Sequence, residues 1–478
     1  MAEQLNTNNQ NEVKIPKRIL NTLLSSLEAG VVPRLGAPYI AIGRQQEIET
    51  LLESLSAVAE GGGAVRFLIG RYGSGKSFLI QLLRGYALER GFLCADADLS
   101  PERRLAGTSG GGLATYRELM RNLASKASPD GGALPVVLSR HYSSLCSLLA
   151  EDGIMPEDES FSYEMKKKVY SVLSAFEGNV GGFDFSRVLA EYYSACICDD
   201  SDKKSACLRW LRGEYSTKTE AKNTLGFSVS AIISDDNWYD YIKLWAVLAA
   251  RLGYKGLVVF VDECVNLYKI SNRISRECNY EKILSIFNDT LQGRAEHLGI
   301  IFGGTPQFLE DTRRGLFSYE ALRSRLCDGR FAEYGYTNIN APVIRLRRLS
   351  DNEFLALIAR LTRLVAQRDS SPELVTGDEM VMFLKSTLAR TGSNELATPR
   401  EIIRDYLTLL SIMKSNPDAS FEKLVKSEPN ISAEDENKEN TLTSASASAS
   451  TASSLAASHS HDGIPVTKRI ITLDDIDI

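Results

Sequence analysis

The sequence predicts an α/β fold in which a parallel sheet is flanked by helices, and three observations predict it. Short apolar runs typical of buried strands occur at residues 65–69, 92–97, 257–261, 298–302 and 343–346. Between and around these runs, apolar residues recur at helical spacing, for example over residues 15–28, 45–59 and 77–90. A glycine-rich stretch lies directly between the first predicted strand and the helix at 77–90.

The composition is that of a globular chain with room for a sizeable core. Of the 478 residues, 44% are hydrophobic and 24% are charged, and this length suggests about two or three structured units. The 55 basic and 61 acidic residues give a formal net charge of −6. That balance argues against a surface coated in positive charge, although it leaves room for a local basic groove.

The chain shows neither a metal-binding cysteine pattern nor a membrane segment. Its 8 cysteines are scattered without zinc-site spacing, which favours a reduced compartment and no zinc. Residues 1–13 are polar, and nowhere is there a run of about 18 apolar residues. We therefore expect a cytoplasmic protein without a membrane partner.

Composition and patterning predict five segments along the chain. A disordered leader (1–13) precedes an α/β core (14–342), in which residues from about 106 to 244 form a helical insertion with loops at 129–134, 178–183 and 216–226. A helical lid (343–416) follows. Residues 417–463, rich in Ser and Ala, are predicted to be a disordered linker, and 464–478 form a short C-terminal peptide with apolar and acidic residues.

The glycine-rich stretch matches the phosphate-binding pattern G-x-x-x-x-G-K-[ST] at every fixed position. It reads Gly70-Arg71-Tyr72-Gly73-Ser74-Gly75-Lys76-Ser77 and is followed by Phe78. Glycines let the backbone curl so that its N–H groups point at phosphate oxygens, and the following helix adds its positive end. Lys76 would reach the β- and γ-phosphates, and the Ser77 hydroxyl would ligate Mg²⁺. This motif predicts a P-loop NTPase fold that binds ATP and magnesium.

A second motif supplies acids at the end of a buried strand. Leu257-Val258-Val259-Phe260-Val261 runs directly into Asp262 and Glu263, which is the Walker B pattern. Asp262 would hold the metal through water, and Glu263 would orient or deprotonate the attacking water. The distance along the chain from Lys76 to Asp262 far exceeds the dozen or so residues that a crossover needs. The helical insertion is predicted to fill it.

Four further residues are candidates for catalytic or nucleotide contacts in an AAA+-like protein. Thr305 follows the predicted strand at 298–302 and fits the sensor-1 position, or simply a turn. Arg323 and Arg325 could act as an arginine finger on a neighbouring subunit, or lie on the surface in salt bridges. Arg400, after a Thr-Pro helix start, resembles the sensor-2 arginine of AAA+ lids, or belongs to an ordinary helix.

Together these motifs resemble the AAA+-like ATP-binding proteins of prokaryotic anti-phage islands, namely the BREX-associated BrxD family and the ATPase subunit of the Shango system. The resemblance covers about residues 14–415 and is more distant to origin-recognition ATPases. Its more specific parts are residues 29–33, Ile42-Gly43-Arg44 and residues 208–214. By this resemblance, the segment Tyr39–Arg44 lies near the adenine, with Tyr39 and Ile42 as the candidate contacts. It also implies a DEAD/DEAH-type helicase partner, in Shango a TerB-domain protein as well, and an oligomer. No winged-helix pattern follows the lid, so the resemblance does not extend to DNA binding through such a module.

Three other features leave their partners open. The cluster Arg209-Trp210-Leu211-Arg212 with Lys218 and Lys222, and the cluster Arg345-Leu346-Arg347-Arg348, fit either a nucleic-acid backbone or a solvated helix face. Residues 464–478 fit either a docking peptide or an end without a partner.

The function that these features favour is a Mg²⁺-dependent ATPase of a defence system that acts with a helicase on DNA. The Asp262-Glu263 pair favours hydrolysis over binding alone. A nucleotide-gated scaffold without turnover is the alternative, and a small-molecule kinase fits the lid and sensor candidates less well.

Overall fold

The first of two compact units contains a five-stranded sheet. The computed structural model describes residues 15–107, 110–176, 178–328, 338, 341–390, 398–416 and 418–426. Its first unit comprises the chain up to Arg348 together with Thr398–Arg400, and its second unit comprises Leu349–Ala397 and the chain from Glu401 onward. The strands are β1 (Gly63–Ile69), β2 (Leu93–Asp98), β3 (Leu257–Asp262), β4 (Leu298–Gly304) and β5 (Val343–Arg345).

All strand pairs in this sheet are parallel, in the order β2-β3-β4-β1-β5. Each predicted strand forms within two residues of its expected ends. The strands are nearly continuous apolar runs because both faces of a parallel sheet are covered. The predicted α/β class with a parallel sheet flanked by helices is therefore confirmed.

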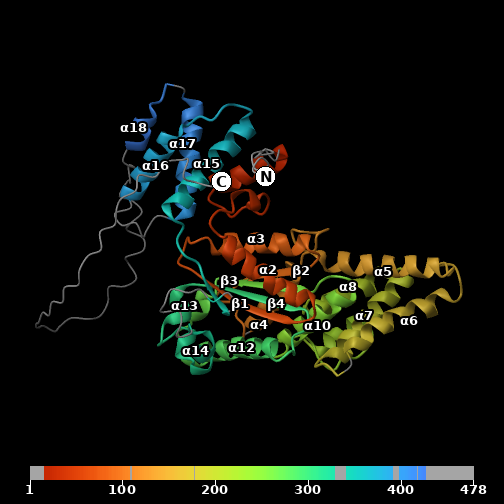
Figure 1. Ribbon diagram of the computed structural model, residues 1–478. Helices are drawn as coiled ribbons and strands as arrows, with labels where there is room; N and C mark the ends of the chain where they lie inside the picture. Colours follow the sequence, from red (N-terminus) through yellow and green to blue (C-terminus); the bar gives the residue numbers. More distant parts are fainter. Residues whose placement is uncertain are drawn as a thin grey trace, which may run out of the picture. The chain divides into compact units, whose positions relative to one another are not determined.

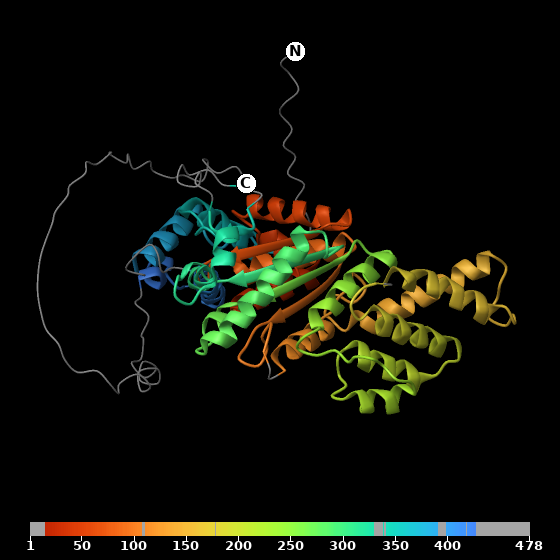
Figure 2. The same cartoon turned by 90° about the horizontal axis from the view of Figure 1, so that it is seen from below.

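Alternate side chains of the strands enter two separate cores. On one face, Leu68, Val258 and Phe260 pack with α2 (Gln45–Ala59) and α3 (Lys76–Glu89). On the other face, the rings of Phe67 and Phe302 stack with their centroids 5.2 Å apart, among residues of α4 (Gly111–Arg121), α10 (Trp238–Arg251) and α12 (Arg273–Leu291). Figure 1 shows these two helical layers on opposite sides of the strands. In Figure 2, α12 (green) runs across the face of the sheet that it covers.

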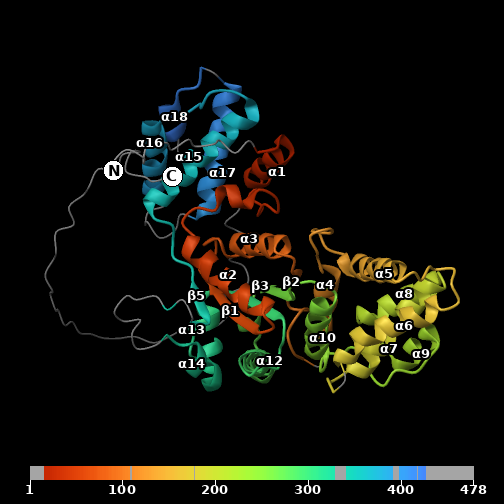
Figure 3. The same ribbon diagram turned by 45° about the vertical axis from the view of Figure 1, so that its right-hand side comes forward.

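A run of helices connects β2 to β3, and α5 to α9 form a lobe beside the sheet (Figure 3). The elements of this run are α4 (Gly111–Arg121), α5 (Ala133–Glu151), α6 (Phe161–Leu173), η2 (Ser174–Phe176), α7 (Gly182–Ile197), α8 (Ser201–Leu211), α9 (Lys218–Leu225) and α10 (Trp238–Arg251). The loop expected at 216–226 was wrong because it contains α9. Thr217 caps this helix by accepting from the Glu220 N–H, Leu225 is buried, and Gly226 ends it at φ 76°.

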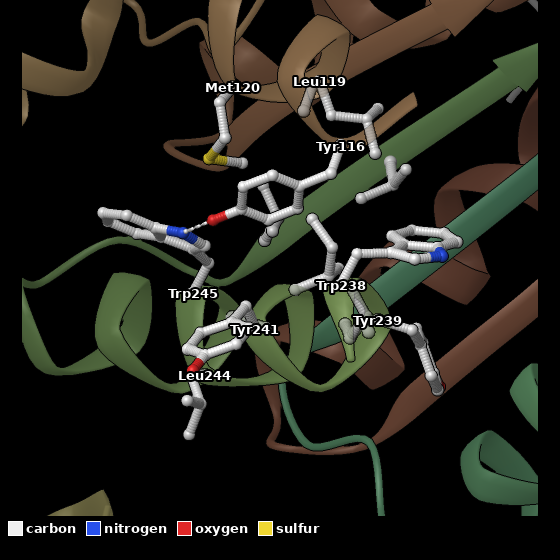
Figure 4. Packing of buried hydrophobic residues seen from close by; sticks show 14 of the residues in the cluster. Tyr116, Leu119, Met120, Trp238, Tyr239, Tyr241, Leu244 and Trp245 are labelled. Carbon is white, nitrogen blue, oxygen red and sulfur yellow. Dashed lines mark hydrogen bonds between the residues drawn. The ribbon is translucent and has the colours of Figure 1, made fainter. Parts of the chain in front are cut away.

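An aromatic cluster ties the helices of this run to one another (Figure 4). The Trp245 Nε1–H of α10 donates to the Tyr116 hydroxyl of α4 at 3.0 Å, and that hydroxyl donates to the Leu211 carbonyl at 2.7 Å. The Trp238 Nε1–H donates to the Leu105 carbonyl at 3.0 Å. Large rings thus fill the core, and the polar atoms of Tyr116, Trp238 and Trp245 have hydrogen-bond partners, as buried Tyr and Trp usually do.

Shorter elements surround the sheet. They are α1 (Lys17–Glu28) and η1 (Ala37–Ile40) before α2, α11 (Val265–Tyr268) after β3, and α13 (Pro306–Glu310), η3 (Leu316–Ser318) and α14 (Glu320–Leu326) after β4. The expected helices at 15–28, 45–59 and 77–90 correspond to α1, α2 and α3.

The second unit is helical and contains α15 (Asp351–Asp369), α16 (Gly377–Arg390), most of α17 (Pro399–Ser415) and α18 (Phe421–Lys426). It begins after β5, rather than at residue 343 as expected for the lid. In its core the rings of Tyr406 and Phe383 pack with their centroids 5.0 Å apart, and the hydroxyls of Tyr406 and Thr362 share a 2.7 Å hydrogen bond. A short helix, α18, forms within the stretch that was expected to be a disordered linker. Its residues Phe421 and Val425 lie one turn apart and are both buried, which stabilises the helix.

The leader 1–13 and the C-terminal peptide 464–478 lie outside the described residues. Within the described part of the chain, no helix is both long and apolar enough to cross a membrane. The cytoplasmic location stays a prediction.

Burial separates the cysteines into groups that an alkylating reagent should distinguish. Burial raises the pKa of the Cys94 and Cys207 thiols to about 12, whereas Cys198, Cys278 and Cys327 are exposed. Because the thiolate is the reactive form, we expect iodoacetamide at neutral pH to modify the three exposed cysteines first. Peptide mass spectrometry over a time course measures this. Modification of Cys94 in the folded protein as fast as that of Cys278 would contradict the fold.

Candidate functional site

The carboxyl ends of β1, β4 and β3 lie side by side because β4 runs between the other two strands. Backbone hydrogen bonds join these ends: the Gly70 N–H donates to the Gly304 carbonyl at 3.1 Å, and the Cys264 N–H donates to the Gly303 carbonyl at 3.0 Å. Ligands of open α/β sheets bind outside the carboxyl ends of the strands. The topology thus brings the two sequence motifs to one edge of the sheet.

The loop between β1 and α3 needs glycine at two positions, one for its backbone angle and the other for space. Gly75 has φ 92°, in the left-handed region that L-residues rarely adopt. A Cβ on Gly70 would lie 2.4 Å from the Ser74 Oγ. Arg71 and Tyr72 are exposed at the outside of the loop, and Phe78 packs partly buried against the core beneath α2 and α3.

The loop presents backbone donors at the start of α3. Among the described residues, the N–H groups of Gly75, Lys76 and Ser77 have no hydrogen-bond acceptor. The first N–H groups of a helix lack intrahelical partners, and the helix dipole adds partial positive charge at the same place. An oxyanion such as a phosphate suits this arrangement.

The Lys76 ammonium lies over the loop. Its Nζ donates to the carbonyls of Gly70 at 3.1 Å and Arg71 at 3.2 Å. Burial lowers the pKa of Lys76, while the nearby carboxylates of Asp262 and Glu263 oppose that shift. The lysine of one motif and the acids of the other therefore lie within electrostatic reach.

A direct hydrogen bond joins the loop to the acidic strand end. The Ser77 Oγ–H donates to the Asp262 Oδ2 at 2.8 Å, and the Glu263 N–H donates to the Asp262 Oδ1 at 2.8 Å. Asp262 is buried, with 8% of its surface exposed. Gly303 of β4 makes room for it, because a Cβ there would lie 2.2 Å from the Asp262 Oδ1.

Glu263 has an unusual backbone. It is a non-glycine residue at φ 54°, and its side chain is exposed. A left-handed conformation costs a non-glycine residue on the order of 1 kcal/mol or more, and such strain clusters at functional sites. The hydrogen bond from the Cys264 N–H to the Gly303 carbonyl holds the chain in this turn.

Asp98 is a neighbouring acid that the sequence reasoning missed. It ends β2 directly beside Asp262 in the parallel register, and burial followed by the charge of Asp262 raises its pKa. The sequence did contain a signal for it, namely an acid directly after the second predicted strand. That strand was expected to end at residue 97, one residue before Asp98, so the acid was not assigned to the strand end.

Arg44 is a second residue that was not singled out as a contact. Its Nη2 donates to the Ser74 carbonyl of the loop at 3.0 Å. It belongs to segment 39–44, in which Tyr39 lies in η1 and both Tyr39 and Ile42 are partly exposed; η1 contacts α3. The nucleotide contacts expected of Tyr39 and Ile42 stay predictions.

The remaining candidates have local partners in the structure. Thr305 caps α13 by accepting from the Phe308 N–H at 3.3 Å, directly after β4. Arg323 and Arg325 are exposed on α14, where Arg323 faces Glu320 at 3.8 Å and Arg325 donates to the Ala321 carbonyl at 2.7 Å. Arg400 lies in the first turn of α17. The sensor and arginine-finger roles stay predictions.

The first basic cluster does not form an exposed aromatic surface. Trp210 is buried at 1% exposure, and Arg209 pairs with Glu220 at 3.1 Å and Glu214 at 3.9 Å. Arg212 also pairs with Glu214 at 3.9 Å. Stacking of bases needs an exposed ring, so these contacts favour the solvated-face interpretation.

In the second basic cluster, Arg345 is paired with two acids. Arg345 lies between Glu310 at 2.5 Å and Asp328 at 2.9 Å.

The donor set fits a magnesium ion that is held partly by phosphates. Among the described residues, no group of three or more His, Cys, Asp or Glu side chains could hold a metal by itself. Mg²⁺ usually takes one or two protein oxygens together with waters and substrate phosphates, and the adjoining oxygens of Ser77 and Asp262 match that need. Fold and site together are compatible with a P-loop NTPase.

Comparison with known proteins assigns the chain to a family. The model of the family described as BREX system ATP-binding protein BrxC/D matches residues 15–429, and the chain belongs to this family. The family is an ATP-binding one from an anti-phage defence system, in agreement with the predicted resemblance to BREX proteins. No curated protein matches the chain. The likeness to the Shango ATPase subunit stays a prediction.

Proposed function

We propose that this chain is a Mg²⁺-dependent ATPase subunit of an anti-phage defence system. One observation carries the proposal: the 2.8 Å hydrogen bond between Ser77 and Asp262, which joins the phosphate-binding loop to the acidic end of β3. The two motifs are far apart in sequence, and the fold brings their polar side chains into direct contact. Membership of an ATP-binding BREX family supports ATP as the bound nucleotide.

The loop would bind the triphosphate. The N–H groups of Gly75, Lys76 and Ser77 would donate to phosphate oxygens, and the Lys76 ammonium would neutralise charge on the β- and γ-phosphates. Ser77 and Asp262 would hold the metal, Ser77 directly and Asp262 through water. When bound, Mg²⁺ supplies positive charge that stabilises the phosphates during transfer.

Glu263 would act on the attacking water. Its carboxylate is exposed beside the buried Asp262 and can orient a water molecule or accept its proton at a carboxylate oxygen. The strained backbone at φ 54° directs this side chain differently from those of the preceding strand. This placement favours hydrolysis over binding alone.

Further roles complete the proposal. Thr305 would sense the γ-phosphate, Arg400 would contact the nucleotide from the lid, and Tyr39 and Ile42 would lie near the adenine. Because Arg323 and Arg325 are exposed on α14, either could reach the site of a neighbouring subunit, so we propose that the protein acts as an oligomer.

The partners are proposed from the resemblance to defence ATPases. They are a DEAD/DEAH-type helicase, in a Shango-like locus a TerB-domain protein as well, and DNA as the substrate on which the complex acts.

The proposal is tested with Lys76→Ala, measured by calorimetry with Mg-ATP and by phosphate release with and without DNA. Loss of charge-assisted hydrogen bonds worth about 1.5–3 kcal/mol should weaken ATP binding by roughly tenfold to a hundredfold or more. Lys423→Ala, which removes an exposed lysine on α18, is the control and should behave like the wild type. Equal ATP affinity of the wild type and Lys76→Ala would refute the site. ATP binding without phosphate release, even with DNA and helicase, would instead identify a nucleotide-gated scaffold.

A further inference from the structure

Arg44 is a buried arginine whose guanidinium bridges two elements. It lies at the start of α2, and only 5% of its side chain is exposed. Its Nη1 donates to the Glu47 Oε1 at 3.1 Å, and its Nη2 donates to the Ser74 carbonyl at 3.0 Å. One side chain therefore fixes a peptide in the middle of the phosphate-binding loop to the helix that precedes β1.

The bonded peptide is the one that carries the Gly75 N–H. The Ser74–Gly75 peptide is planar and trans, so its carbonyl and its N–H point in opposite directions. Holding the Ser74 carbonyl toward Arg44 therefore turns the Gly75 N–H away from Arg44. That N–H has no acceptor among the described residues, and it adjoins the similarly free N–H groups of Lys76 and Ser77.

Without such a restraint, this peptide would be able to rotate. Gly75 is a glycine at φ 92°, and glycine allows a wide range of backbone angles. A rotation would turn the Ser74 carbonyl, with its partial negative charge, toward the place of the phosphates.

We propose that Arg44 is a positioning residue that orients the Ser74–Gly75 peptide so that the Gly75 N–H is available to a β- or γ-phosphate. The inference rests on the proposed function of this loop and adds a residue outside the motif to it.

The role is geometric rather than a matter of net charge. Glu47, 12% exposed at its side chain, offsets the charge of Arg44 at 3.1 Å. The planar fork of an arginine can serve two acceptors at once, whereas a lysine presents a single nitrogen. Arg44→Lys keeps the positive charge but should hold either Ser74 or Glu47 less well, which separates geometry from charge.

The experiment is calorimetry on the full chain with Mg-ATP and, separately, with AMP, which lacks the β- and γ-phosphates. We expect Arg44→Gln to weaken Mg-ATP binding by about tenfold to a hundredfold, the effect of one charge-assisted hydrogen bond, and to leave AMP binding unchanged. Arg44→Lys should show a smaller loss in the same direction. Glu47→Gln, which leaves the bond to Ser74 in place, should bind Mg-ATP nearly as the wild type does.

The outcomes separate this inference from the proposed function. A wild-type protein that gives no heat with Mg-ATP refutes the function itself. A wild type that binds, with an Arg44→Gln variant that binds Mg-ATP equally well, overturns the role of Arg44. Equal proportional loss of ATP and AMP affinity together with a lower melting temperature would show that Arg44 only stabilises the fold. If Arg44→Gln does not fold, Arg44→Lys must still bind Mg-ATP more weakly than Glu47→Gln; equal affinities overturn the inference.

Discussion

Glu263→Gln is expected to lower the rate of phosphate release by about a hundredfold or more, while ATP binding stays near that of the wild type. A positioned general base contributes roughly 10²–10⁴-fold to a rate, and the amide that replaces the carboxylate cannot accept the proton. Glutamine is the right substitution because it keeps the Cβ and the length of the side chain, so the left-handed backbone at φ 54° experiences the same strain. Single-turnover phosphate release and calorimetry with Mg-ATP measure the two quantities.

A matched control is Glu281→Gln, which makes the same chemical change at an exposed position of α12. It should release phosphate at the wild-type rate. Unchanged phosphate release in Glu263→Gln removes the catalytic role proposed for this residue. A parallel loss of ATP binding would instead indicate that Glu263 supports the nucleotide site.

Gly303→Ala should disable the site by displacing Asp262. The added Cβ would lie 2.2 Å from the Asp262 Oδ1, closer than any real contact, so the carboxylate must move away from the Ser77 hydroxyl. Loss of this charge-assisted hydrogen bond costs about 1.5–3 kcal/mol, and overpacking costs a further 1–3 kcal/mol. We expect a fall in ATPase rate on the order of a hundredfold and a lower melting temperature. Phosphate release across a magnesium titration and thermal unfolding measure both.

Gly299→Ala provides a control on the same strand. A Cβ at Gly299 would meet its nearest neighbour, a methyl of Val58, at 3.5 Å, which is ordinary van der Waals contact. Neither glycine has a positive φ, so alanine suits the backbone at both positions. Full activity of Gly303→Ala, or an equal loss in both variants, would show that the space beside Asp262 does not matter.

Sequence alone predicted the strands well because each is a short apolar run between polar stretches. The runs at residues 257–261 and 298–302 are buried on both faces, so their pattern is strong. The phosphate-binding loop was also accessible because its glycines, lysine and serine are contiguous. The short helix α9 was missed because Lys218 to Leu225 has only two buried positions, too few for a clear helical period.

Asp98 and the contact between Arg44 and the loop were missed for the same physical reason. Asp98 and Arg44 join the site only through the order of the strands and the path of the chain before α2. No local pattern marks a side chain whose partner is the carbonyl of Ser74, since every residue has such a carbonyl. Whether the Trp210 ring is exposed likewise depends on tertiary packing, which buries it in the core.

The strand order also determines when the site can assemble during synthesis. The first two strands to leave the ribosome, β1 and β2, are not neighbours: β1 pairs only with β4 and β5 in the described sheet, and β2 pairs only with β3. At ordinary elongation rates the chain between β1 and β4 takes on the order of ten seconds to make. Throughout that interval the strand before the glycine-rich loop has both edges open, which makes the nascent chain a natural client for chaperones that shield unpaired strands.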